Sequence, residues 1–276
     1  MGFRIQNNIT ALNAHTNLTT SDTKLSQSLQ RLSSGFRINA AKDDAAGLAI
    51  SQAFRANIAS IRVAQQNVTE GNAMLQVAEG AINTIGDILT RMKELATQAA
   101  SANAGDDGRI KINNEYNTLV LEIDRIVSAT QYSGTKLIDG TFKGQAFQIG
   151  YDSVTAYSQL VVASLGDLST TELGVARDAL DDQDKATAAL AVIDDAISVM
   201  GQERANIGAL QNRMDYAAAN LATALENFTS AESVIRDVDM ALEMTTFTKN
   251  QILVQSGVAM LAQANATPQQ ILSLLQ

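Results

Sequence analysis

Apolar residues recur every three or four positions through most of the chain, which is the spacing of helices that bury one face. The first such segment is polar and carries only a narrow apolar stripe, in which Leu18, Leu25 and Leu32 lie one heptad apart. A stripe this narrow is typical of a helix that meets another helix, and it buries too little surface to be stable alone. The segment is expected to end at Ser33-Ser34-Gly35, because glycine readily adopts a left-handed backbone there.

Two long helices are predicted to begin at paired aspartates, which favour a helix start. One is expected to run from about 44 to about 102, after Asp43-Asp44, and the other from Asp181-Asp182 over more than 40 residues. A break at 103–108 and a third helix over 109–129 lie between them. About 50 helical residues extend roughly 75 Å, so the sequence predicts a rod. The expected buried positions are Val68, Leu75, Ala78, Ile82, Ile85, Leu89, Met92, Leu95 and Ala99; then Ile112, Leu119, Ile123 and Ile126; and then Ile193, Ile197, Met200, Ile207, Leu210, Met214, Ala217, Leu221, Leu225, Phe228 and Ile235.

The character of the chain changes at about 133–178, which holds six of the 17 glycines. Short runs at 136–138, 146–149 and 159–162 read as strands separated by turns, so a small β-hairpin region is expected. Helix resumes from about 240 to 265, and Thr267-Pro268 reads as an N-cap and the first residue of a further short helix. The predicted fold class is therefore mainly α, a long antiparallel helical rod or coiled coil with a small β-hairpin region.

Composition excludes several kinds of chemistry. The 276 residues carry 20 basic and 29 acidic side chains, a net charge of −9 that argues against nucleic-acid binding. There is no Cys and only one His, His15, so thiolate catalysis, Cys-ligated zinc and most His-based triads are excluded. Neighbouring acids such as Asp194-Asp195 diverge on a helix and do not form a catalytic pair. No enzyme activity, cofactor or metal is predicted, no apolar run is long enough for a membrane span, and no cleaved signal peptide is expected.

The two ends of the chain match in character. Both are amphipathic helices with few charges, and neither has a partner close in sequence. We expect them to pair with each other and with copies from neighbouring molecules, and a head-to-tail contact that does not close gives a helical filament. The predicted residues of this inter-subunit packing are Ile5, Ile9, Leu12, Leu18, Leu25, Leu29, Leu32, Leu253, Val258, Leu261, Leu272 and Leu275, whereas Met200, Met214, Met240, Met244 and Met260 are expected to serve in packing.

Three segments resemble bacterial flagellins. Residues 32–50 (LSSGFRINAAKDDAAGLAI) are similar to the N-terminal signature of that family, as are residues 9–14 (ITALNA). Residues 260–275 (MLAQANATPQQILSLL) resemble the flagellin C-terminus. The resemblance covers about 1–140 and 180–276, and the long variable middle of many flagellins is missing, so the chain looks like a short flagellin with two domains.

The resemblance implies a domain D0 of 1–44 and 236–276, a coiled coil that lines the filament channel. It also implies a domain D1 of 45–235, which includes the β-hairpin region at about 133–178. A flagellin is an extracellular homopolymer of the bacterial flagellum that serves swimming motility, and it is exported through the type III apparatus without a cleaved signal. The implied partners are the flagellar cap, hook-associated proteins and an export chaperone at the C-terminal helix, with no nucleic acid and no membrane.

A further resemblance concerns immune recognition. Residues 89–98 (LTRMKELATQ) resemble the D1 stretch bound by the Toll-like receptor for flagellin. The match implies that Arg91 supplies a planar charged donor, Leu95 an apolar anchor and Glu115 an acceptor. Spacing alone favours the plainer interpretation of a core leucine and two surface charges, and it is the motif match that favours a receptor site.

Two alternatives to a filament subunit stay open at this point. The first is the hook–filament junction protein of the same family, which would not form long filaments alone. The second is a cytoplasmic signalling coiled coil of the chemotaxis-receptor type, which would need a membrane span or a partner in its place and would not carry a β-rich hairpin between helical arms.

Overall fold

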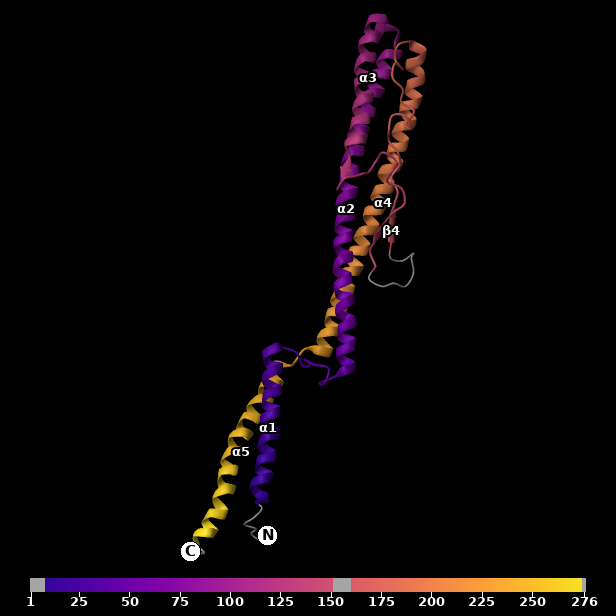
Figure 1. Cartoon of the computed structure of the whole chain (residues 1–276). Coiled ribbons are helices and arrows are strands. Elements are labelled where there is room, and N and C mark those ends of the chain that lie inside the picture. The colour runs from indigo at the N-terminus through magenta and orange to yellow at the C-terminus, as the bar shows by residue number, and fades with distance from the viewer. Residues whose placement is uncertain (1–7, 151–159, 275–276) are drawn as a thin grey trace. The chain divides into compact units, whose positions relative to one another are not determined.

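A computed structural model describes the backbone of residues 8–150 and 160–274 (Figure 1). The described residues form five long helices that pack in antiparallel fashion, with two small antiparallel sheets of two strands each. The prediction of a mainly α fold with a small β-hairpin region is therefore confirmed. The helices are α1 Ile9–Ser34, α2 Ala45–Ala100, α3 Gly105–Ala129, α4 Gln183–Arg236 and α5 Met240–Leu274, with a 3-10 turn at Ala102–Ala104; the strands are β1 Gln131–Tyr132, β2 Thr135–Lys136, β3 Gln145–Gln148 and β4 Leu160–Ala163.

Local signals fix the junction between α1 and α2. Gly35 has φ 75°, and its N–H donates to the carbonyl of Arg31 at 2.8 Å, so α1 ends where the sequence predicts. Asp44 accepts a hydrogen bond from the Gly47 N–H at 2.8 Å and caps α2. A Cβ atom at Gly47 would lie 2.8 Å from the end of the Ile38 side chain, so a larger residue in this first turn of α2 would force that side chain to move.

The chain divides into two compact units, one of Met1–Ala56 with Asn227–Gln276 and one of Asn57–Glu226. The second unit holds most of the core. There α2 and α4 run antiparallel, as two hydrogen bonds between them show. Asn72 donates to Asp215 at 2.9 Å, whereas Glu79, later on α2, accepts from Gln211, earlier on α4, at 2.9 Å. Every buried position predicted for α2 is buried, and the stripe on α4 is buried or half-buried throughout.

The buried face of α3 differs from the prediction. Ile112, Leu119 and Ile126 are only half-buried, and the buried stripe lies one position further along the helix. The reason is that polar residues with partners take core positions. Arg109 donates to the Ala99 carbonyl at 3.0 Å, which closes the α2–α3 turn. The buried residues of α3 are Arg109, Asn113, Tyr116, Val120, Ile123 and Val127.

The β region forms two hairpins. Residues 145–148 pair with 160–163 in a register that places Phe147 opposite Val161, close to two of the predicted runs. The predicted run at 136–138 is a strand only at Thr135–Lys136, which pairs with Gln131–Tyr132. Beyond it the chain leaves the ladder, and the side chains of Leu137 and Ile138 lie fully in the core.

The predicted short helix starting at Thr267-Pro268 is wrong. Helix α5 continues to Leu274 without a break, and the Thr267 hydroxyl donates to the Gln263 carbonyl at 2.9 Å, as it does inside a helix. A proline in a helix removes the hydrogen bond to the carbonyl four residues earlier, here that of Ala264.

The loop before α4 is held to α3 by amide side chains. Asp178 has a left-handed backbone with φ 56°, and its carboxylate accepts hydrogen bonds from Asn117 at 2.7 Å and Asn113 at 3.1 Å. These bonds, that of Asn117 foremost, lower the pKa of Asp178 below its ordinary value of 3.8. Asn113 also donates to Asp181 at 2.6 Å, so one buried amide anchors two carboxylates.

The substitution Asp178→Asn tests this anchor. Asparagine tolerates the left-handed backbone but loses the charge. A carboxylate whose pKa is lowered by folding stabilises the fold above its unfolded pKa, and this contribution is lost as pH falls through the folded pKa. The variant is expected to unfold at lower denaturant than the wild type at about pH 7, and the difference should shrink as the pH falls through the lowered pKa of folded Asp178. Equal denaturation midpoints of variant and wild type at neutral pH would contradict the anchoring role of Asp178. The control is Asp195→Asn, which removes an exposed carboxylate on α4.

Candidate functional site

The candidate site is the pair of terminal helices. Helices α1 and α5 lie side by side and antiparallel, with the start of α1 next to the end of α5 (Figure 1). The more shielded positions of both helices recur at alternating steps of three and four, which is the spacing of a two-helix seam. The seam consists of Ala11, Ala14, Leu18, Ser21, Leu25, Ser28 and Leu32 on α1, and Glu243, Phe247, Asn250, Val254, Gly257, Leu261 and Ala264 on α5.

Four of the residues predicted for packing between subunits already contribute to this seam within one chain. Leu18, Leu25 and Leu32 are half-buried in it, together with Leu261 from α5. A Cβ atom at Gly257 would lie 3.1 Å from the Leu18 side chain, so glycine lets the two helices approach closely. Because many seam residues are small or polar, the contact is narrow and leaves the rest of each helix uncovered.

Asn8 joins the two helices at one end of the seam. Its side-chain oxygen accepts from the Ala11 N–H at 3.0 Å and caps α1, and its amide group donates to the Ala264 carbonyl at 2.8 Å. That carbonyl is the one that Pro268 leaves without a helical donor. The Asn8 amide thus supplies the hydrogen bond that proline removes, which explains how α5 continues through Thr267-Pro268.

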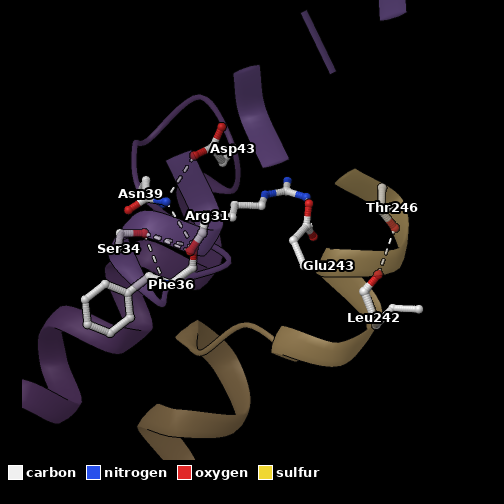
Figure 2. Close-up of polar contacts among 8 residues, drawn as sticks. All are labelled: Arg31, Ser34, Phe36, Asn39, Asp43, Leu242, Glu243 and Thr246. Carbon is white, nitrogen blue, oxygen red and sulfur yellow. Dashed lines mark hydrogen bonds and ion pairs between the residues drawn. The ribbon is translucent and has the colours of Figure 1, made fainter. Parts of the chain in front are cut away.

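A charged pair joins the helices at the other end (Figure 2). The Arg31 side chain reaches across to Glu243, with 3.6 Å between Nη1 and Oε2. Glu243 is buried, and within the described part of the chain its other oxygen has no hydrogen-bond partner.

The turn after α1 is closed by its own polar groups (Figure 2). Ser34 Oγ accepts from the Phe36 N–H at 3.2 Å, and the Asn39 amide donates to the Phe36 carbonyl at 3.0 Å. Asp43 accepts from the backbone N–H groups of Ala40 and Asn39, and these bonds lower its pKa.

Backbone pairing connects this turn to the segment between α4 and α5. The Arg37 N–H donates to the Arg236 carbonyl at 2.7 Å, and the Val238 N–H donates to the Gly35 carbonyl at 3.0 Å. The Arg236 guanidinium lies over the Phe36 ring, 4.1 Å from its centroid. Both helix connections of the terminal unit are therefore fixed to each other.

The outer faces of both helices carry exposed apolar side chains. Leu12 is 66% exposed and Val258 is 54% exposed, and the predicted packing residues Ile9, Leu29 and Leu253 are exposed as well. Ile5 and Leu275 lie outside the described residues, and for Leu272 the structure describes only the helical backbone. Residues not included in that prediction belong to the same faces: Met240, Leu242, Met244, Ile252 and Met260.

Three of the five methionines predicted to pack in a helical core are exposed in the single chain, so the prediction is wrong for them there. Met200 and Met214 are buried, as expected, but Met240, Met244 and Met260 are exposed. Helical spacing predicted that all five would pack, because spacing does not show how many neighbours a helix has. Helix α5 has apolar residues on several sides, and α1 covers only one of them.

The residues implied to bind the Toll-like receptor lie in the compact unit of residues 57–226. Arg91 donates to Glu115 through Nε at 3.0 Å and Nη2 at 2.8 Å, and to Glu94 at 2.9 Å; the bonds to Glu115 contribute most to raising the pKa of Arg91. Arg91 and Glu115 are about half exposed, on α2 and α3. Leu95 is 2% exposed and packs in the core, so its side chain is not available as an anchor on this surface.

Nothing in the described ranges suggests a metal centre or a membrane span. No group of His, Cys, Asp and Glu there is placed to hold a metal ion. None of the helices in the described part of the chain is both long and apolar enough to cross a bilayer.

The substitution Asn8→Asp separates the two roles of Asn8. Aspartate keeps the capping oxygen but cannot donate to the Ala264 carbonyl. The variant should lose about 1 kcal/mol of seam stability, seen as about fivefold faster hydrogen exchange of α1 amides. Asn8→Ala should exchange faster still, because it also loses the cap. The exposed Asn13→Asp on α1 controls for charge, and unchanged exchange in Asn8→Asp would refute the dual role.

Comparisons with known proteins identify the family. Residues 5–143 match the bacterial flagellin N-terminal helical region, and residues 190–275 match the C-terminal helical region. The flagellar filament 33 kDa core protein of Treponema phagedenis and a flagellin of Halalkalibacterium halodurans are each 40% identical to this chain, with 99% of both chains covered. The crystal structure of Bacillus cereus flagellin has a TM-score of 0.51 and 28% identity over 56% of this chain and 88% of that one. The chain belongs to the bacterial flagellin family.

Proposed function

We propose that this protein is a structural subunit that polymerises into the bacterial flagellar filament and so serves swimming motility. The observation that carries the proposal is the exposed apolar face on each terminal helix, exemplified by Leu12 and Val258, which the seam between them leaves uncovered. In a filament, neighbouring subunits cover these faces. Exposed apolar surface of this kind marks a site of association between proteins.

The energetics favour a contact that uses many of these residues at once. Full burial of an aliphatic side chain contributes about 1.5–3 kcal/mol, so covering its exposed half contributes about 1 kcal/mol. Association costs about 4–15 kcal/mol in lost freedom of motion. One or two such residues cannot offset that cost, whereas the combined faces of α1 and α5 can, and they do so for every subunit added to a polymer.

The relatives favour a bulk filament subunit over the junction protein. The full-length relative from Treponema phagedenis is named a filament core protein, and the one from Halalkalibacterium halodurans is named a flagellin. Membership of this family also removes the chemotaxis-type signalling coiled coil as an alternative. An enzymatic role has no support in the described residues.

The finer assignments follow from the same proposal. The D0 domain of 1–44 and 236–276 contains the α1–α5 pair, and the D1 domain of 45–235 contains α2, α3, the β hairpins and all of α4 except Arg236. The subunit is exported through the type III apparatus, without a cleaved signal, to the cell exterior. An export chaperone covers the apolar face of α5 before assembly, and the flagellar cap and hook-associated proteins contact the ends of the filament.

A substitution on the outer face tests the filament proposal. Val258→Asp is expected to raise the protein concentration needed for seeded polymerisation by about tenfold or more, because assembly would bury an unpaired carboxylate. Sedimentation of filaments, checked by electron microscopy, measures this concentration. The monomer should keep its helix content, because Val258 is exposed in the single chain.

The matched control is Val258→Leu, which keeps an apolar side chain at the same position and is expected to polymerise like the wild type. If Val258→Asp and Val258→Leu assemble at the same concentration, this face of α5 is not covered in the filament.

A second proposal concerns recognition by the Toll-like receptor of hosts. It is supported by the exposed Arg91–Glu115 pair, which presents a fixed guanidinium and carboxylate across α2 and α3. A guanidinium that is already oriented loses little freedom when it binds a partner. Leu95 contributes indirectly, because its buried side chain helps to hold α2 in the core.

Arg91→Asp is expected to abolish signalling by free subunits in receptor-expressing reporter cells, because it reverses the charge beside Glu94 and Glu115. Arg125→Asp is the control, since Arg125 is also exposed and pairs with an acid, Glu122. Undiminished signalling by a folded Arg91→Asp subunit would refute the assignment.

A further inference from the structure

The methionines fall into two groups that differ sharply in exposure. The sequence contains eight, and Met1 lies outside the described residues. Four belong to the unit of residues 57–226 and are at most 5% exposed: Met74, Met92, Met200 and Met214. The other three lie on α5 and are about half exposed or more: Met240 at 49%, Met244 at 49% and Met260 at 63%.

The α5 methionines lie on the sides of the helix that α1 leaves uncovered, together with other exposed apolar residues. Leu242 lies between Met240 and Met244, and Val258 lies two positions before Met260; both are exposed. None of the three methionines belongs to the shielded seam positions that face α1. Their thioether groups are therefore accessible in a free subunit. In a polymer they would be covered together with the other exposed apolar residues of α5.

We propose that Met240, Met244 and Met260 are the sites at which peroxide oxidises the free subunit, and that this modification blocks its polymerisation. The effect on assembly rests on the filament function proposed above. The site selection rests only on exposure. The chain has no Cys, so no thiol competes for the oxidant.

The chemistry is a two-electron oxygen transfer. The thioether sulfur attacks one oxygen of hydrogen peroxide, the O–O bond breaks, and that oxygen becomes bound to sulfur. The second oxygen leaves with both hydrogens as water, so thioether and peroxide give sulfoxide and water. Sulfur is oxidised and peroxide is reduced, and no other reactant is needed.

The consequence follows from the change in polarity. A sulfoxide is a strong hydrogen-bond acceptor, whereas a thioether is nearly apolar. Burying an acceptor without a donor is unfavourable, and the neighbouring outer-face residues Leu242 and Val258 offer no side-chain donor. Three sulfoxides on the sides of α5 that α1 leaves uncovered should therefore weaken assembly while leaving the α1–α5 seam intact.

Peptide mass spectrometry of the full chain tests the selection of sites. Free subunits are treated with hydrogen peroxide, and sulfoxide is expected at Met240, Met244 and Met260, with at least about tenfold less at the four buried methionines. Intact filaments treated in the same way are expected to be protected at the three α5 sites. Equal oxidation of both groups in free subunits would overturn the proposal.

Seeded polymerisation tests the effect on assembly. Oxidised subunits are expected to need about tenfold higher concentration, and treatment with methionine sulfoxide reductases should restore assembly. The triple variant M240L/M244L/M260L should assemble and be insensitive to peroxide. The matched variant M74L/M200L/M214L keeps the α5 methionines and should stay sensitive; the single variant M200L serves if the triple core variant does not fold.

The outcomes separate the two proposals. If untreated wild-type subunits fail to form filaments, the filament function fails. If untreated subunits assemble and oxidised wild-type subunits assemble equally well, only the inference about oxidation is overturned.

Discussion

The structure depends on a simple constraint, which is that one helix can cover only one face of another. In the terminal unit α1 packs along α5 over the residues that the structure describes, and their seam uses the faces that carry Leu18 and Gly257. The faces that carry Leu12 and Val258 are left exposed. In the unit of residues 57–226, α2 is bonded to α3, α4 and the β region. Residues such as Leu89 and Ile123 are therefore completely buried within one chain.

Because the seam is narrow, polar groups at its two ends contribute strongly to its register. Asn8 ties the start of α1 to the Ala264 carbonyl, and Arg31 meets Glu243 at the opposite end. A charged pair whose carboxylate is buried and keeps one oxygen without a hydrogen bond adds little net stability, since desolvation of Glu243 offsets the attraction. It does penalise other registers, in which the buried Glu243 carboxylate would have no cation near it. The seam therefore owes its specificity to its ends and its modest stability to the leucines between them.

Local signals are sufficient to predict the end of α1, the start of α2 and the buried face of α2, because the Gly35 turn, the Asp44 cap and the apolar spacing of α2 all act within a few residues. The errors came from distant partners. The face of α3 was misplaced because Arg109 and Asn113 occupy core positions, where they bond to residues of other segments. Helix α5 continues past Pro268 because Asn8, 256 residues before Ala264, supplies the missing donor. No pattern within α5 could reveal that contact.

The contrast between the units explains how one chain can be stable alone and still depend on its neighbours. The unit of residues 57–226 does not need a partner chain to fold, because its core is buried by its own residues. The terminal unit is different, because any molecule that covers the outer faces of α1 and α5 binds only when those helices are formed and so stabilises them. Ordering of the terminal helices and addition to a polymer are then one linked equilibrium. A charge at Val258 or an oxygen on Met260 would therefore shift that equilibrium toward the free subunit. Neither change would alter the packing of the core in residues 57–226.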